Sequence, residues 1–184
     1  MEVGRLNKRA TILALTPDLA TIELGGVWLA IASKDAADLA PQVGVRSLAR
    51  VDIRARYSDR LQQGRYLKHG NRLFHLTSVR DPTGTKAELR CSADEFVGEA
   101  AIYKPEGVPP RPCRVNLAFD APYRDEYGKV VEYRTKAEVV LIETGRVQAD
   151  EQLIVGTTTY NVLGYADETD DGIVRGLWLQ PMEG

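Results

Sequence analysis

Apolar and polar residues alternate along most of this chain, a pattern typical of strands with one buried face and one wet face. The run "RVDIRAR" is the clearest case, because Val51, Ile53 and Ala55 alternate with charged residues. No segment has the 3.6-residue period of a long amphipathic helix. The pattern therefore predicts a mainly β protein in which only short helical turns interrupt the strands.

Two segments break the alternation and favour short helical turns. The first, "SKDAADLAPQVGVRSLAR", is rich in Ala and offers Ser33 or Asp35 as an N-terminal cap, with Pro41 as a helix breaker. The second is "ADEFVGEA", and it follows a predicted strand. The Gly25-Gly26 pair within "TIELGGVWLAIAS" suits a bulge or bend in a strand instead.

Two distant stretches share one pattern. These are "GRYLKHGNRLFHLTSVRD" and "DEQLIVGTTTYNVLGYAD", which begin at residues 64 and 150. Gly70 and Gly156 occupy the predicted turns, and an aromatic residue follows each, Phe74 and Tyr160. The two glycines are 86 residues apart, and so are the two aromatic residues. We interpret each stretch as the central hairpin of one domain, so the repeat predicts two related domains.

The first of these hairpins is predicted to turn at Gly70-Asn71, two residues that tolerate a positive φ. On the return strand, Phe74 and Leu76 are expected on the buried face. Leu73, His75 and Thr77 are expected on the other face, with His75 in contact with water. The second stretch has an Asn 86 residues after His75, at the matching position. Because an Asn cannot act as a general base, we expect His75 to have a structural role.

The boundary between the two domains is predicted from the prolines. Four prolines fall within "PEGVPPRP", and such a segment is a poor candidate for a helix or a strand ladder. We interpret residues 101–112 as a Pro-rich linker, residues 1–100 as an N-terminal β-barrel domain and residues 113–184 as a C-terminal one. The expected fold class is thus two tandem small β-barrel or sandwich domains.

Signatures of catalysis, cofactors and metals are missing from the sequence. It contains neither G-x-S-x-G nor a phosphate-binding glycine pattern, so we expect no enzyme and no cofactor. Cys91 and Cys113 lack metal-ligand spacing and are expected to be ordinary reduced residues. The sequence has no run of about 18 apolar residues, so we expect no membrane-spanning helix. A cluster of four acidic residues is interpreted as an exposed turn rather than a cation site: Asp167, Glu168, Asp170 and Asp171.

Charge is distributed unevenly. The net charge is −2, yet residues 1–92 carry 15 Lys and Arg against 9 Asp and Glu, and the rest carries 9 against 17. We interpret one set of arginines as a subunit or partner interface: Arg46, Arg50, Arg54 and Arg56. A basic small barrel could instead bind nucleic acid, although that mode needs aromatic stacking platforms.

The later half, residues 115–181, resembles the lambda-type head–tail joining protein of tailed phages. The resemblance rests on "AFDAPY" and on "VVLIETGRVQADEQLIVGTTTYNVLGYADETDDGIVRGLWLQP". The positions that match are Asp150, Leu153, Gly156, Tyr160, Val162, Gly172, Leu177, Trp178 and Leu179. Residues 1–92 are similar to the related head–tail joining family of long-tailed phages, through "GRLNKRATI", "VWLAI" and "RVDIRARYSDRL".

The resemblance implies a non-enzymatic virion protein at the neck, made in the host cytoplasm. It would form a homo-oligomeric ring at the portal vertex, close the DNA-filled head and bind portal or adaptor proteins and tail proteins. Contact with packaged DNA would be passive, and no membrane would be involved. A tail terminator and a portal-bound adaptor are alternatives. The loops expected to face neighbours or the DNA channel contain Asp125, Glu126, Asp167, Glu168, Asp170 and Asp171.

Overall fold

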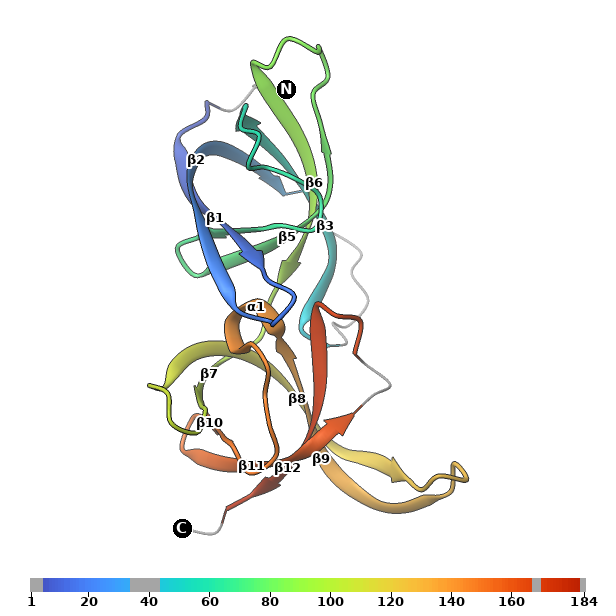
Figure 1. Ribbon diagram of the computed structural model, residues 1–184. Helices are drawn as coiled ribbons and strands as arrows, with labels where there is room; N and C mark the ends of the chain where they lie inside the picture. The colour runs from blue at the N-terminus through green and yellow to red at the C-terminus, as the bar shows by residue number, and fades with distance from the viewer. Residues whose placement is uncertain (1–4, 34–43, 167–169, 183–184) are drawn as a thin grey trace. The chain divides into compact units, whose positions relative to one another are not determined.

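The computed structural model describes residues 5–33, 44–166 and 170–182 (Figure 1). Within them, twelve strands and one four-residue helix are found. The chain divides into two compact units, residues 1–97 and 98–184. The predicted class, a mainly β chain with two tandem domains, is confirmed, and the described part of each unit is a six-stranded closed barrel.

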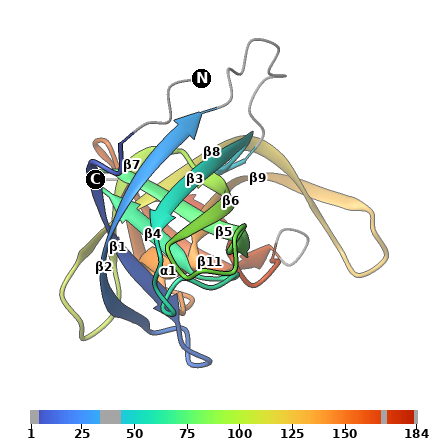
Figure 2. The ribbon, with the colours of Figure 1, turned by 90° about the horizontal axis from the view of Figure 1, so that it is seen from above.

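The first barrel is formed by β1 to β6 and closes in the order β1-β2-β3-β6-β5-β4 (Figure 2). Every neighbouring pair of strands in it is antiparallel. Its strands are β1 (Lys8–Leu15), β2 (Thr21–Ser33), β3 (Arg46–Arg56), β4 (Tyr66–His69), β5 (Arg72–Arg80) and β6 (Glu88–Phe96). The expected bulge in β2 is confirmed, because the register with β1 shifts beside Gly25, which has a φ of 120°.

The second barrel repeats this order of strands and closes as β7-β8-β9-β12-β11-β10. Its strands are β7 (Glu99–Lys104), β8 (Arg111–Arg124), β9 (Val130–Val140), β10 (Gln152–Val155), β11 (Thr158–Ala166) and β12 (Val174–Pro181). The helix α1 (Leu141–Thr144) follows β9. The carboxylate of Glu143 holds this helix to β8, because it accepts hydrogen bonds of 2.9 Å from the backbone N–H and from Nη2 of Arg114.

The 86-residue repeat extends well beyond the two turns. Strands β4 and β5 begin and end 86 residues before β10 and β11. The Leu76 carbonyl accepts a 2.8 Å bond from the N–H of Gly64, and the Val162 carbonyl accepts one of 2.8 Å from Asp150. The register shifts of β5 and β11, after Leu76 and Val162, are also 86 residues apart. The two stretches therefore form the same structural unit, as the sequence pattern predicted.

Both repeated turns use glycine at their first position. Gly70 has a φ of 57° and Gly156 has a φ of 59°, while the second loop residues, Asn71 and Thr157, are outside the positive-φ region. A positive φ at the first loop residue alone is the pattern of a type II′ turn, which matches the twist of a two-residue hairpin. Asn71 therefore does not adopt the positive φ that the sequence permitted.

Each barrel has its own core. The first is packed around Phe74, Leu67 and Ile53, and the second around Tyr103, Leu153 and Leu177. Phe74 and Leu76 are buried as expected. Leu73, expected on the wet face, is buried as well, and His75 is half-buried with its ring 5.1 Å from that of Tyr66. The outer face of β5 is therefore partly covered, which alternation alone did not predict.

The predicted linker at residues 101–112 is wrong. Residues 101–104 belong to β7, residues 111–112 begin β8, and Ile102 is paired with Pro112. The prolines crowd into the turn of a hairpin, where few backbone N–H groups are needed for a ladder. The boundary between the units falls at Val97-Gly98 instead.

The two helical predictions differ in outcome. In "ADEFVGEA", Ala93 and Phe96 are buried residues of β6, so the expected helical turn is wrong and the burial of these side chains outweighs the low strand propensity of Ala, Asp and Glu. The first helical segment, with Ser33 or Asp35 as cap, lies mainly within 34–43, outside the described residues, and its last residues, 46–50, belong to β3.

Candidate interaction surfaces

The first barrel carries a groove on its outer surface that we call the arginine groove. It has a volume of about 960 Å³, and Arg50, Arg54, Arg80 and Arg90 are among the residues that line it. Asp52, the hydroxyl groups of Ser78 and Ser92, and the apolar side chains of Ala30 to Ala32 complete much of its wall. Two of the four arginines predicted as an interface, Arg50 and Arg54, thus lie here, whereas Arg46 and Arg56 do not line the groove.

Three of these arginines form a row across the sheet. Arg54 is directly opposite Arg90 in the pairing of β3 with β6, and Arg80 is directly opposite Arg90 in the pairing of β5 with β6. Side chains of directly opposed residues lie about 5 Å apart at their Cβ atoms, and like charges in these positions destabilise a sheet. The row therefore concentrates positive charge at a cost in stability.

One of the arginines is neutralised within the barrel. Glu88 accepts hydrogen bonds from Nε and Nη2 of Arg54, at 2.7 and 2.6 Å, and this contact lowers the pKa of the Glu88 carboxyl. Among the described residues, no acidic group lies within 4.0 Å of the other three guanidinium groups, those of Arg50, Arg80 and Arg90. Asp52 also lines the groove, so three exposed cations and one further carboxylate share it with the ion pair, and arginines still outnumber acidic residues in the lining by four to one.

The second barrel carries a projecting hairpin, which we call the arm (residues 116–134). Strand β7 pairs with β8 only as far as Val115, and β12 pairs with β9 only as far as Thr135. Beyond these points β8 and β9 pair with each other alone, and the ribbon stands clear of its own barrel (Figures 1 and 2). The loop expected around Asp125 and Glu126 is limited to residues 125–129, because β8 continues to Arg124 and β9 begins at Val130.

Exposed apolar side chains are concentrated on the arm. The exposed fractions are 64% for Phe119, 86% for Tyr127, 62% for Val131 and 67% for Tyr133. A two-stranded ribbon is only marginally stable by itself in water, and its outer edges leave backbone N–H and C=O groups unpaired by a sheet. Exposed apolar groups on such a ribbon are typical of a surface that is covered by a partner.

The two faces of the arm differ. On one face, the Tyr123 ring makes a T-shaped contact with Trp178 at 5.3 Å, and the Arg134 guanidinium lies 3.9 Å above the Tyr123 ring. Val131 and Tyr133 alternate with Arg134 along β9, so they belong to the opposite face. The arm is thus anchored to its own barrel by one face and presents Val131 and Tyr133 on the other.

The tip of the arm contains two residues predicted to face neighbours, Asp125 and Glu126. The carboxylate of Asp125 closes the turn, because Oδ1 accepts hydrogen bonds from the backbone N–H groups of Tyr127 and Lys129 at 3.0 and 2.9 Å. Glu126 is exposed and makes no such contact with a described residue. The position at an exposed tip agrees with the prediction, while the identity of the neighbour stays a prediction.

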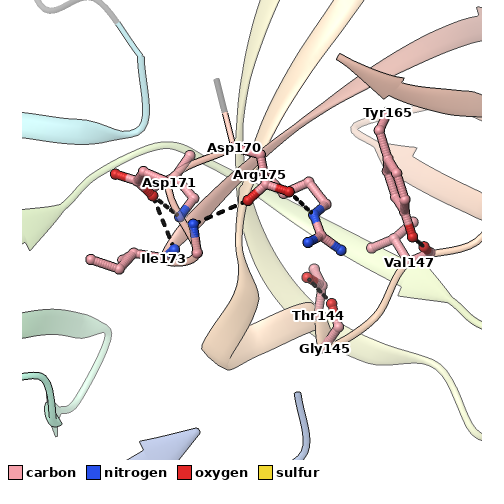
Figure 3. Close-up of polar contacts among 10 residues, drawn as sticks. Thr144, Gly145, Val147, Tyr165, Asp170, Asp171, Ile173 and Arg175 are labelled. Atoms are coloured by element: carbon pink, nitrogen blue, oxygen red, sulfur yellow. Dashed lines mark hydrogen bonds and ion pairs between the residues drawn. The ribbon is translucent and has the colours of Figure 1, made fainter. Parts of the chain in front are cut away.

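In the second acidic turn, the carboxylates of Asp170 and Asp171 bind groups of the turn itself and of the strand that follows it (Figure 3). Asp171 Oδ1 accepts hydrogen bonds from the N–H groups of Ile173 and Val174 at 3.0 and 2.8 Å, and Asp170 forms a 2.7 Å ion pair with Arg175. These carboxylates close a turn, as expected of an exposed acidic turn. Asp167 and Glu168 lie outside the described residues.

A buried carboxylate in the second barrel was missed by the sequence analysis. Glu151 is 8% exposed and accepts hydrogen bonds from the Tyr103 hydroxyl, from the Gln148 N–H at 2.6 Å and from the Glu106 N–H at 3.2 Å. Burial, together with the Glu151 contact, raises the pKa of Tyr103, so the phenol stays a donor. Glu151 therefore joins the proline-containing turn to the segment before β10 and has a structural role.

The two cysteines are buried, one in each barrel, and are not joined by a disulfide. Burial raises the pKa of Cys91 to about 11 and that of Cys113 to about 12. Because the thiolate is the reactive form, both thiols are suppressed at neutral pH. We expect iodoacetamide to react about 100-fold or more slowly with the native protein than with the urea-unfolded protein at pH 8. Equal rates in mass-spectrometric labelling would contradict this burial.

Residues 5–33, 44–166 and 170–182 contain no group of three or more His, Cys, Asp or Glu arranged to hold a metal ion. No helix in the described part of the chain is long and apolar enough to cross a membrane. What the described surface does offer is a charged groove on the first barrel and an apolar arm on the second. Both are suited to binding another macromolecule.

Comparison with known proteins adds no relative from which a function could be carried over. No family model, curated protein or solved structure matches this chain.

Proposed function

We propose that this chain is a structural protein of a tailed phage or prophage, a head–tail connector that forms a ring at the portal vertex. In this role it closes the DNA-filled head and receives the tail. The resemblance of both halves to head–tail joining proteins supplies the virion context. Two alternative roles in the same neck are a tail terminator and an adaptor that binds directly to the portal.

The observation that best supports an assembly role is the arm. Phe119, Tyr127, Val131 and Tyr133 expose apolar surface on a ribbon that leaves its own barrel, and burial of such surface in a partner drives association. A ring also requires heterologous contacts that close by rotation, so each copy must present two different surfaces. Two barrels of opposite net charge meet this requirement, since residues 1–97 carry 15 basic and 11 acidic residues and residues 98–184 carry 9 and 15.

The deciding experiment is to look for the chain in the particle and to remove it. We expect mass spectrometry of purified virions to find the chain in a fixed ratio to the portal protein. Deletion of its gene should leave DNA-filled heads and free tails that do not join, as seen by electron microscopy. A virion that lacks the chain, or infectious particles assembled without it, would overturn the proposal.

A second candidate function, nucleic-acid binding, is favoured by the arginine groove. Against it, no aromatic residue is among those that line the groove, so bases have no stacking platform there. If duplex DNA binds through phosphates, the Arg80→Gln/Arg90→Gln variant should lower the slope of log K against log salt by about 2. Affinity and slope that do not change in the variant would exclude the groove as a DNA site.

A further inference from the structure

We propose that the arginine groove receives the arm of a neighbouring copy, so that the first barrel of one chain binds the second barrel of the next. This inference rests on the proposed ring. It names the two surfaces that meet, and the occupant to which it commits is a second copy of this chain.

The groove has an excess of positive charge, because four arginines line it and Asp52 is the single acidic residue among the described lining residues. Arg80 and Arg90 are exposed and directly opposed across β5 and β6, and Arg50 is exposed on β3. An arrangement that violates a local rule of sheet stability is expected at a functional site. Carboxylates from a partner would remove the repulsion, because guanidinium groups bind them through paired, charge-assisted hydrogen bonds.

The arm has the complementary chemistry. Asp120 and Glu126 are exposed carboxylates on it, and the structure shows no hydrogen bond or ion pair from either side chain to a described residue. Tyr127, which is 86% exposed, follows Glu126 directly at the tip. The apolar wall of the groove from Ala30 to Ala32 can receive this ring while the arginines receive the carboxylates.

The direction of the contact follows from charge and topology. The groove belongs to the positive unit and the arm to the negative unit, so long-range attraction favours first barrel to second barrel over like with like. Groove and arm are different surfaces of one chain, so the contact is heterologous. Such a contact passes from copy to copy and closes into a ring when the rotation per copy divides a full turn.

Cysteine crosslinking in the assembled particle tests the contact directly. We expect a Ser78→Cys/Glu126→Cys chain, incorporated into virions and mildly oxidised, to give a ladder of disulfide-linked oligomers on a denaturing gel. The matched control is Arg56→Cys/Glu126→Cys, because Arg56 is exposed on β3 and does not line the groove. A ladder that is no stronger than in this control, from particles that contain the chain, would overturn the inference and leave the proposed connector role intact.

Charge reversal provides a second measurement, which does not depend on disulfide formation. Arg80→Glu/Arg90→Glu should weaken the incorporation of the chain into particles by about tenfold or more, and Asp120→Lys/Glu126→Lys should do the same. Combining the four changes should restore much of the loss, whereas Arg56→Glu should have little effect. Circular dichroism checks that each variant folds. Absence of rescue, or loss of DNA binding with normal incorporation, would contradict the inference.

Discussion

Replacing Phe74 by alanine should lower the free energy of unfolding of the first barrel by about 3–5 kcal/mol, the usual cost of removing a buried phenylalanine ring. Phe74 is 1% exposed and belongs to the core cluster of that barrel, opposite Leu67. The loss combines the transfer free energy of the ring with the cavity that it leaves. Because each barrel has a separate core, the second barrel should keep its stability.

Hydrogen exchange with mass spectrometry reports on the two barrels separately in the intact chain. Exchange should accelerate in peptides from residues 5–33 and 44–97 and stay unchanged in those from residues 98–166. The matched control is Phe119→Ala on the arm, where the ring is 64% exposed and the change should stay within about 0.5 kcal/mol. Equal acceleration in both barrels would show that they unfold as one cooperative unit.

Replacing Glu151 by alanine should destabilise the second barrel by about 3 kcal/mol. Its carboxylate accepts hydrogen bonds from the backbone N–H groups of Gln148 and Glu106 and from the Tyr103 hydroxyl, and removal would leave these donors unpaired at a cost of about 1–3 kcal/mol for each that stays buried. Urea unfolding, followed in the second barrel by hydrogen exchange, measures the change.

Two further variants separate the contributions at this site. Glu151→Gln keeps the shape and one acceptor oxygen, so it should cost less than alanine. Glu126→Ala removes the same type of side chain from the exposed tip of the arm and should change stability by no more than about 0.5 kcal/mol. An alanine variant at Glu151 that is as stable as the Glu126 variant would show that the buried network is dispensable.

The sequence predicted the fold class because barrel strands depend on a period of two, which can be recognised without knowing the partners of each strand. The repeat was equally visible, since its glycines and aromatics mark turn and core positions that the fold requires. Gly70 and Gly156 both adopt the positive φ of their turns, and Phe74 and Tyr160 are both buried. These are local constraints, so they leave a local signal in the sequence.

Other features depend on which strands become neighbours. Arg80 and Arg90 are ten residues apart in the chain, and only the register of β5 with β6 places them side by side. A one-residue slip would have separated them, and register is not readable from a single strand. Two members of the groove, Arg50 and Arg54, were singled out from the sequence, but the groove itself could not be.

The arm and the hairpin turn at the prolines were misread for opposite reasons. Asp125 and Glu126 were expected in a loop because Pro, Asp and Gly surround them, although the chain has only 13 aromatic residues and three of them, Phe119, Tyr123 and Tyr127, fall within nine positions of this region. That density of aromatic residues in a polar segment was the available signal. Around Pro105 to Pro112 the prolines suggested a break between domains, but a tight turn accepts them as readily as a linker does.

The free edges of the arm also bear on how the protein behaves at high concentration. An extended ribbon with exposed aromatic side chains could template open-ended stacking of strands, the route by which many β proteins form fibres. Pro122 lacks an N–H donor, and the register of β8 with β9 is interrupted after Ala118 and again after Tyr123. A ribbon interrupted in this way is a poor template for a flat sheet, so concentrated samples should form finite oligomers and should not form fibres.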